Sequence, residues 1–514
     1  MSREEAAHIL RPISSTPAAP TSEGSGSNAV STISGSPSAS DPYDCSTERS
    51  PSFDTTSDTK NLVSVEQRRL QQQSHRSTTS FHIGLNYVNS ILGSGIVGIP
   101  YALKQAGFGL GLFLLIAIAL VTDYSLSLLV KSANLAGVTS YQDLVHVCFG
   151  GPGWFVVSML QLIYPLIAMW SYNVIIADTV SKILPLASRN TIVFLSTVFI
   201  TLPLSLQKNI ARMSKISMIS LFLIIYISGF VIVRFPYYSD LVGTSDDHYT
   251  ILGDGIGTIV QAIAIICFSF QCHHSSFLLY GALEEPTQLR WDNVTHLAIG
   301  ISLLVSFVFG ISGYASFKAL SEADLFENYC LSDRGANIAR LLFAVTVALT
   351  YPVECFVVRD VIEKLLWASK DLLSDSHHLM ITILIVISTY LLSTLTDCLG
   401  VVLELNGLMT GLPLAFILPS ICYIKLESGS IFSKRKIYAL LLAIFGVTIA
   451  TIGALKVLSQ TFLSGSSATD TCSHGLELDY CRTFNHSRKL EFPVSTNETM
   501  KHWSTNSTNN VPMG

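Results

Sequence analysis

The feature of this sequence that most restricts its fold is a series of long apolar segments, each long enough to cross a lipid bilayer. A helix needs about 20 apolar residues to span roughly 30 Å of hydrocarbon. Lipid offers no hydrogen-bond partners to the backbone, so each crossing segment must be a helix that satisfies its own N–H and C=O groups. We predict eleven spans, at approximately 82–105, 108–130, 154–184, 191–207, 213–235, 255–282, 294–317, 336–362, 378–396, 399–423 and 437–457.

The low content of charged residues supports a membrane protein and argues against several other classes. Asp, Glu, Lys and Arg make up 13% of the chain, whereas about 25% is usual in soluble proteins. The formal net charge of −5 gives no basic field that would attract nucleic acid. The sequence shows no nucleophile with a base beside it and no Gly-rich ATP-binding motif. We therefore expect an all-α integral membrane protein that is not an enzyme and binds no nucleic acid.

Composition divides the chain into three parts, at 1–78, 79–458 and 459–514. The first part is rich in Ser and Thr and has no apolar period, so we expect a disordered tail. Lys and Arg are more frequent in the loops that would lie in the cytosol if this tail is cytosolic. An odd number of spans then places the last part outside the cytosol. Its three sequons, expected to be glycosylated there, begin at Asn485, Asn497 and Asn506.

Four cysteines fall on the side of the membrane away from the cytosol in this arrangement: Cys330, Cys398, Cys472 and Cys481. A bridge between Cys472 and Cys481 is one pairing, and a bridge between Cys330 and a cysteine of the tail is another. The sequence does not choose between these two pairings.

Two apolar spans contain residues that weaken or interrupt a helix. The first span holds Gly93, Ser94 and Gly95 after Asn89, and small residues of this kind let a ligand approach the backbone. The sixth span holds a polar cluster at 269–276, which is costly in hydrocarbon unless it lines a cavity or caps an unwound turn. Packing between helices and an internal polar network are the alternatives. Because the sixth span would open a second five-helix half, the matching positions favour an inverted-repeat transporter with a site at the membrane midplane.

The eighth span presents oxygen atoms on one face. Thr346, Thr350 and Glu354 recur every four residues and so share a helix face. Pro352 leaves the carbonyl of Ala348 without its usual donor. Hydroxyl and carbonyl oxygens suit a hard cation such as sodium, although threonines in membrane helices also bond back to their own carbonyls.

Three acidic residues lie within the predicted spans, at Asp178, Glu354 and Glu404. An unpaired carboxylate is costly at this depth, so each is a candidate functional residue. Glu354 and Glu404 are candidates for a proton-coupling role. Structural pairing is the alternative, and Arg359 is close to Glu354 along the helix.

The stretch FHIGLNYVNSILGSGIVGIPYALKQAG, at 81–107, resembles the first helix of the sodium-coupled neutral amino acid transporter family, within the amino acid/auxin permeases. The resemblance continues at 164–183, 201–217, 272–287, 324–330, 349–359 and 397–407, so it covers essentially the whole membrane region. It implies a LeuT-like fold with two inverted five-helix repeats, unwound first and sixth spans, and one additional helix.

The resemblance also implies which residues form the sites. The family's sodium site corresponds to Asn89 and Thr350, with main-chain carbonyls near Leu92 as further ligands and Thr346 on the same face as Thr350. The implied substrate-binding residues are Gly93, Ser94, Gly95, Phe270, Gln271, Cys272 and His273. Many members have one His followed by Pro after the Cys, whereas this chain has His273 and His274. The identity of the preferred amino acid therefore remains open.

These observations predict a secondary active transporter that moves a small neutral amino acid together with sodium or a proton. No cofactor is expected apart from the co-transported sodium ion. An amino-acid sensor or scaffold in the lysosomal membrane, with the same fold and little or no flux, is the alternative. The plasma membrane is the first choice of location, although Glu5 to Leu10 resembles an endolysosomal sorting signal.

Overall fold

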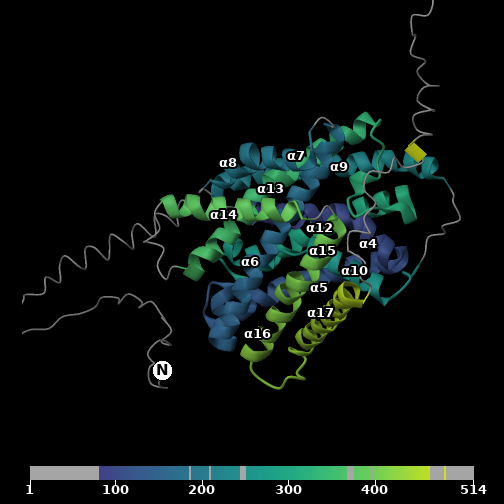
Figure 1. Ribbon diagram of the computed structural model, residues 1–514. Coiled ribbons are helices and arrows are strands. Elements are labelled where there is room, and N and C mark those ends of the chain that lie inside the picture. Colours follow the sequence, from purple (N-terminus) through teal and green to yellow (C-terminus); the bar gives the residue numbers. More distant parts are fainter. Residues whose placement is uncertain are drawn as a thin grey trace, which may run out of the picture. The chain divides into compact units, whose positions relative to one another are not determined.

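The computed structural model describes residues 80–184, 187–207, 210–243, 251–366, 375–395, 398–463 and 480–481. In these ranges the chain is helical and has no β-strand (Figure 1). The first predicted tail, the three sequon asparagines and Cys472 lie outside the described residues, so the three-part division and the glycosylation stay predictions.

The helices follow one another along the chain with short connections. Up to residue 243 they are α3 (Ser80–Ile91), η1 (Ser94–Gly98), α4 (Ile99–Ala106), α5 (Phe108–Ala136), α6 (Tyr141–Ile183), α7 (Arg189–Ser196), η2 (Thr197–Thr201), α8 (Leu202–Ser205) and α9 (Ile210–Val242). The next group is α10 (Ile256–Ser269), η3 (His273–Ser275), α11 (Ser276–Tyr280), α12 (Gln288–Phe317), η4 (Lys318–Leu320), η5 (Leu325–Glu327) and α13 (Arg334–Leu366). The last group is α14 (Asp375–Ser393), α15 (Leu399–Asn406), η7 (Gly407–Gly411), η8 (Pro413–Ile417), α16 (Leu418–Leu426) and α17 (Ile437–Leu463).

Nine helical segments of the described chain are long and apolar enough to cross a membrane. The other two predicted spans explain the difference from eleven. The first predicted span is interrupted between α3 and η1, and the fourth, Arg189–Ser205, is a shorter apolar helix. The all-helical membrane class is therefore confirmed, whereas the count of eleven stays a prediction.

Polar side chains and glycines fix several helix ends, as the local sequence dictates. The Ser140 hydroxyl accepts a hydrogen bond from the Asp143 amide, 3.0 Å away, at the start of α6. Gly137 ends α5 with φ of 67°, a conformation that costs glycine little. Gly150, with φ of 69°, separates the two helical segments that make up α6.

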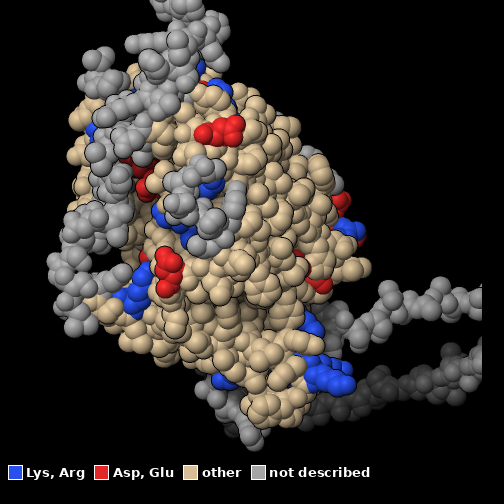
Figure 2. All heavy atoms as spheres, turned by 90° about the vertical axis from the view of Figure 1, so that its right-hand side faces the viewer, with Lys and Arg blue, Asp and Glu red and all other residues tan. Residues whose placement is uncertain are grey.

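α10 lies in the interior of the described helices and α17 at their surface. α10 contacts α4, α15, η1 and η7, and its residues from Ala262 to Ser269 are all buried. Many large apolar side chains of the long helices are exposed, including Phe113, Phe222 and Leu384. Figure 2 shows one face on which Lys, Arg, Asp and Glu are sparse among the other residues. Exposed apolar side chains of this number suit lipid rather than water.

A disulfide joins Cys330, in the connection between η5 and α13, to Cys481. This bond excludes the alternative in which Cys481 pairs with Cys472. Cys398 also takes part in a disulfide. Near the Cys330 bond, the Tyr480 hydroxyl donates to the Asn328 carbonyl at 2.5 Å, so two adjacent residues hold the 480–481 segment on this loop.

We predict that Cys330→Ser and Cys481→Ser lower the stability of the protein equally, by roughly 2–4 kcal/mol, because either change removes the same cross-link between distant segments. Thermal unfolding in detergent would measure the loss. The double variant should be no less stable than either single variant. Losses that add in the double variant would show that the two sulfurs act separately.

Candidate functional site

The first predicted break is present and begins just before the Gly-Ser-Gly sequence. α3 ends at Ile91, and the Leu92 amide makes the last helical bond, to the Val88 carbonyl at 2.9 Å. Gly93 has φ of −53° and ψ of −135°, outside the helical region, and η1 starts at Ser94. The chain from Gly93 to Gly98 is buried, so this non-helical turn lies inside protein and not against lipid.

The second predicted break separates α10 from η3. α10 ends at Ser269, and Phe270 and Cys272 have non-helical backbone angles. The hydroxyls of Ser275 and Ser276 both donate to the Cys272 carbonyl at 3.1 Å, which helps to satisfy the backbone where helical bonds are lost. The polar sequence of this segment therefore supplies its own partners.

The two breaks lie against each other. The Ser269 hydroxyl donates to the Gly95 carbonyl at 2.8 Å. A Cβ added at Gly95 would lie 2.6 Å from the Cα of Ser269, so only glycine permits this approach. On the other side, the hydroxyls of Tyr87 and Ser276 are 2.7 Å apart. The first and sixth predicted spans thus meet where both are interrupted.

α6 forms a wall beside both breaks. Ser171 and Ser94 have their hydroxyls 2.8 Å apart, and the Tyr172 hydroxyl would lie 2.9 Å from a Cβ at Gly93. The Tyr164 hydroxyl donates to the Gln271 carbonyl at 3.3 Å. These contacts place three side chains of α6 at the junction of the two breaks.

Sequence reasoning did not single out these α6 residues. The available signal was the group of Tyr, Ser and Gln side chains in an otherwise apolar span, from Gln161 to Tyr172. Such groups are costly in lipid unless they face a partner. Placing these residues on a helix of 3.6 residues per turn would have shown that they share one polar face of the span.

Several buried polar atoms at the junction have no hydrogen-bond partner among the described residues. They are both amide atoms of Gln271, both ring nitrogens of His273 and the Oδ1 atom of Asn89. All three side chains are almost completely buried. Buried polar atoms normally have partners, so these atoms are suited to contact a polar ligand or ion. The other predicted residues, Phe270 and Cys272, are buried at the same break.

His274 contacts Glu354 across the interior. The His274 Nε2 and Glu354 Oε2 atoms are 2.9 Å apart, and both side chains are at most 2% exposed. The predicted alternative, a pair between Glu354 and Arg359, is wrong. Arg359 instead donates to the Ser205 carbonyl and the Thr382 hydroxyl, both at 3.2 Å, so its side chain binds α8 and α14.

The predicted sodium ligands lie on α3 and α13, which are in contact. The Thr350 hydroxyl donates to the Thr346 carbonyl at 3.0 Å, and the Thr346 hydroxyl donates to the Leu342 carbonyl at 2.8 Å. Both threonines therefore make the bonds to their own helix that the sequence allowed as an alternative. A donating hydroxyl keeps lone pairs for a cation, and the unpartnered Asn89 Oδ1 adds a further oxygen. Oxygen donors of this kind suit a hard cation such as sodium.

The other two intramembrane acids have permanent cations as partners. The Glu404 carboxylate of α15 is 2.6 Å from the Lys456 ammonium of α17. The Asp178 carboxylate of α6 is 2.7 Å from the Arg189 guanidinium of α7. The alternative of structural pairing therefore describes both residues, which cross-link neighbouring helices.

A loop at 321–330, here called the cover loop, lies against the first break. Its η5 contacts η1. The Asn328 side chain donates to the Leu320 carbonyl at 2.7 Å and accepts from the Glu322 amide at 2.8 Å. Arg340 donates to the Phe326 carbonyl at 3.1 Å. Together with the Cys330 disulfide, these bonds hold the loop in one conformation over η1.

Asp324 is a buried acid in the cover loop. Its Oδ1 atom accepts from the Phe326 amide at 2.9 Å. Burial, together with the nearby Glu327 carboxylate, raises the pKa of Asp324 to about 7. The loop that contacts η1 therefore contains a carboxyl group that changes charge near neutral pH.

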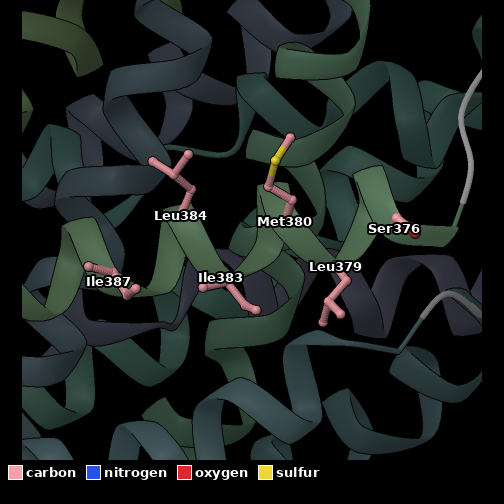
Figure 3. A pocket seen from close by; sticks show the side chains of 6 residues that line it. All are labelled: Ser376, Leu379, Met380, Ile383, Leu384 and Ile387. Atoms are coloured by element: carbon pink, nitrogen blue, oxygen red, sulfur yellow. The ribbon is translucent and has the colours of Figure 1, made fainter.

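A shallow apolar hollow of about 480 Å³ lies elsewhere, on α14. Figure 3 shows the side chains that line it, with Met380 and Leu384 on one side of the helix and Leu379 and Ile383 on the other. No predicted site residue lines this hollow, and its side chains are largely exposed. Its chemistry suits lipid contact.

Known proteins resemble this chain over most of its length. A family model described as transmembrane amino acid transporter protein matches residues 76–459. "Putative sodium-coupled neutral amino acid transporter 11" of Danio rerio is 42% identical over 78% of this chain and 89% of its own. The Homo sapiens protein of the same name is 40% identical over 75% of this chain and 94% of its own.

A more distant relative and two solved structures extend the comparison. "Vacuolar amino acid transporter 2" of Saccharomyces cerevisiae is 30% identical over 75% of this chain and 84% of its own. Two mutant structures of a manganese transporter from Eremococcus coleocola have TM-scores of 0.52 and 0.51. Both are 12% identical to this chain and cover 80% of it, with 92% and 91% of their own chains covered. They show a similar fold and no more.

We predict that Gly95→Ala destabilises the folded protein by about 1–3 kcal/mol, because the added Cβ would force the two breaks apart. Thermal unfolding in detergent would measure this change. Gly300→Ala in α12 is the matched control, since nothing lies within 4 Å of its added Cβ. Because alanine is favoured over glycine inside a helix, Gly300→Ala should raise the free energy of unfolding by up to about 1 kcal/mol. Equal effects at both glycines would contradict the close contact.

We also predict that Asp324 makes the protein less stable as the pH rises towards 7. Its folded pKa of about 7 exceeds the ordinary value of 3.8, so its stabilising contribution is complete below about pH 4 and is lost as the pH rises through 7. Between these two pKa values, the free energy of unfolding falls by about 1.4 kcal/mol per pH unit. Asp324→Asn, which keeps the oxygen that accepts from Phe326, should remove this slope in unfolding measurements. The exposed Asp254→Asn should leave it unchanged, and a slope that survives in Asp324→Asn would contradict the assignment.

Proposed function

This chain belongs to the family of transmembrane amino acid transporter proteins, and from that premise we propose that it is a sodium-coupled symporter of small neutral amino acids. The observation that supports this most directly is the contact between two helix breaks, made by Ser269 and the Gly95 carbonyl. Main-chain groups become available to a ligand only where a helix is interrupted. The names of the relatives also couple neutral amino acids to sodium.

The proposed substrate site is the junction of the two breaks. The α-carboxylate would bind near the start of η1, where N–H groups and the helix dipole favour an anion. The ammonium group would bind carbonyl oxygens at the end of α10. The unpartnered side chains of Gln271 and His273 would contact the remainder of the amino acid. A zwitterion held this way needs no charged side chain of its own, which suits a neutral substrate.

The proposed sodium site joins α3 to α13 through Asn89 and the hydroxyls of Thr346 and Thr350, with the Leu92 carbonyl as a further ligand. Sodium bound there would fix the end of α3 relative to α13. Because the substrate turn follows directly after α3, sodium would order the turn that receives the amino acid. This link between the two ligands is the proposed basis of coupling.

The conformational part of the proposal is alternating access in a LeuT-like arrangement of eleven spans, with two inverted five-helix repeats and one additional helix. The first, second, sixth and seventh spans would rock against the others. We place the first tail in the cytosol and the last one outside it, glycosylated, in the plasma membrane. A sensor with the same site and little or no flux, in the lysosomal membrane, is the alternative.

We predict that the purified full chain in proteoliposomes takes up labelled neutral amino acids faster under an inward sodium gradient. Thr350→Ala should raise the half-saturating sodium concentration about tenfold or more, because a contact with a charged group is worth roughly 1.5–3 kcal/mol. Asn89→Asp should change the same parameter, because it adds a charge to the site. A panel of neutral amino acids, each with and without sodium, would identify the substrate.

Thr451→Ala is a matched control for Thr350→Ala. The Thr451 hydroxyl also donates to a carbonyl four residues earlier, that of Val447 at 2.7 Å, but it is exposed on α17. Uptake by this variant should equal that of the unaltered chain. Specific amino-acid binding without any flux would favour the sensor, and uptake that ignores sodium would overturn the sodium coupling.

A further inference from the structure

The turn between α16 and α17, at 427–436, presents two apolar side chains at the surface. Phe432 is 79% exposed, the largest exposed fraction among the large apolar side chains of the described chain, and the adjacent Ile431 is 51% exposed. Apolar residues exposed singly are normal, whereas adjacent ones rimmed by polar residues mark a surface that contacts a membrane or another molecule. The tip of this turn, Ile431 and Phe432, therefore indicates an apolar partner outside the chain.

Hydrogen bonds within the turn hold this tip in a defined conformation. Lys436 is only 4% exposed, and its ammonium group donates to the Ile424 carbonyl at 2.9 Å and to the Gly429 carbonyl at 3.0 Å. The Lys436 amide also donates to the Ser433 carbonyl at 2.9 Å. A basic side chain near a helix end commonly satisfies the last carbonyls in this way. The tip is thus displayed by a turn whose backbone is bonded on both sides of it.

Basic side chains surround the tip. Lys425, Lys434 and Arg435 are exposed, and Glu427 is the one acidic residue between 424 and 436. Arg435 lies 3.5 Å from the Glu427 carboxylate, but its side chain is 77% exposed, so the guanidinium remains open to a second anion. Among the described residues, no carboxylate pairs with Lys425 or Lys434. The turn therefore has an excess of positive charge that an anion would neutralise.

Neighbouring helices extend this basic surface. The Lys425 ammonium lies 4.8 Å from the centre of the Phe149 ring of α6, and the Lys131 ammonium of α5 lies 5.2 Å from the centre of the Tyr423 ring. An aromatic face attracts an ammonium group, which still has N–H donors for an anion. Figure 2 shows Lys and Arg side chains at the lower end of the helices, where the turn lies in Figure 1. The basic surface thus reaches from the turn to α5 and α6.

The exposed apolar surface of the turn continues along α17. Tyr438, Leu441 and Ile444 recur every three residues and are 66%, 56% and 54% exposed, so they follow one side of the helix. α17 is among the helices long and apolar enough to cross a membrane. A strip of this kind faces acyl chains, so the turn lies where the strip reaches the lipid headgroups. The basic residues of the turn then lie at the depth of the headgroup phosphates.

We propose that the turn at 427–436, together with Lys425, binds an anionic phospholipid of the leaflet that we predict to face the cytosol. The tip inserts among the acyl chains, and Lys425, Lys434 and Arg435 bind the headgroup. A phospholipid joins an anion and an apolar chain in one molecule, as this surface requires. A soluble anion would leave Phe432 in water, and an apolar protein surface would leave the basic residues without partners.

This lipid site is separate from the candidate transport site. None of its residues lies in the two helix breaks, and the inference does not depend on the proposed sodium coupling. The turn connects α16 to α17, which pack against each other, so a lipid held there bridges the ends of two membrane helices. Each exposed Lys or Arg beside an anionic lipid surface strengthens binding about fivefold.

The test places a fluorescent reporter at the tip of the turn in the full chain. Phe432→Trp is reconstituted in lipid nanodiscs that contain an increasing fraction of brominated phosphatidylserine or of brominated phosphatidylcholine, because bromine quenches a tryptophan that touches it. The chain has five tryptophans of its own, so the quenching of the unaltered chain is measured and subtracted. The added tryptophan should be half-quenched at a lower fraction of phosphatidylserine than of phosphatidylcholine.

Removal of the basic side chains should abolish this preference. In the Phe432→Trp chain, Lys434→Gln and Arg435→Gln should each raise the half-quenching fraction of phosphatidylserine about fivefold, and the two together tenfold or more. The half-quenching fraction of phosphatidylcholine should stay the same, because its headgroup has no net charge.

Arg334→Gln is the matched control for each single variant. It also removes one positive charge from an exposed side chain, but Arg334 begins α13 on the side that we predict to face away from the cytosol. In the Phe432→Trp chain it should leave both half-quenching fractions unchanged. Melting temperatures in detergent without anionic lipid should be equal for all of these variants, because every altered side chain is exposed.

Three results would overturn the lipid site and leave the proposed transport function intact. They are equal quenching by the two lipids, a preference for phosphatidylserine that survives in Lys434→Gln with Arg435→Gln, and a preference that inorganic phosphate abolishes, which would indicate a site for a soluble anion. If Phe432→Trp does not fold, native mass spectrometry of the otherwise unaltered chain decides. That chain should then retain one more phosphatidylserine than Lys434→Gln with Arg435→Gln, and equal numbers would overturn the site.

Discussion

The structure depends on the requirement that backbone polar groups inside a membrane find partners. Continuous helices meet it by themselves, but the breaks at Gly93 and at Phe270–Cys272 cannot. They are tolerated because they are buried against each other, with the Ser269 hydroxyl on the Gly95 carbonyl and two serine hydroxyls on the Cys272 carbonyl. The same requirement decides where main-chain groups become available to a ligand. The candidate site is therefore a direct consequence of how the chain solves its hydrogen bonding in lipid.

The sequence predicted those features that depend on local composition. Long apolar runs predicted the membrane helices, and small or polar residues within two of them predicted both breaks. The predicted number of spans differs from the number of long apolar helices in the described chain. The helix interrupted at Gly93 and the segment Arg189–Ser205 are each shorter than a continuous span. Length and hydropathy describe one segment at a time, so an interruption that shortens a helix removes that helix from a count based on length.

Partners across helices could not be predicted in this way. Arg359 is close to Glu354 along the helix, yet its guanidinium binds Ser205 and Thr382, while Glu354 binds His274, 80 residues away in the chain. Which side chains meet depends on how α13 is rotated against α6 and η3, and no single-helix pattern contains that rotation. The cysteines show the same limit, since Cys330 pairs with Cys481 over a separation of 151 residues.

The hydrogen bonds of the site fall into two groups with different consequences for motion. Bonds from Tyr87 to Ser276 and from Ser269 to the Gly95 carbonyl join the two broken segments to each other. Bonds between Ser94 and Ser171, from the Tyr164 hydroxyl to the Gln271 carbonyl, and between His274 and Glu354 join these segments to α6 and α13. If the broken pair moves as one body, the first group persists and only the second is exchanged. These three bonds each involve a hydroxyl or an imidazole, which can bond again to water, substrate or a neighbouring side chain. The bond from Tyr164 ends on a main-chain group, so a movement of the broken segments against α6 would free the Gln271 carbonyl for another donor, such as water or the substrate.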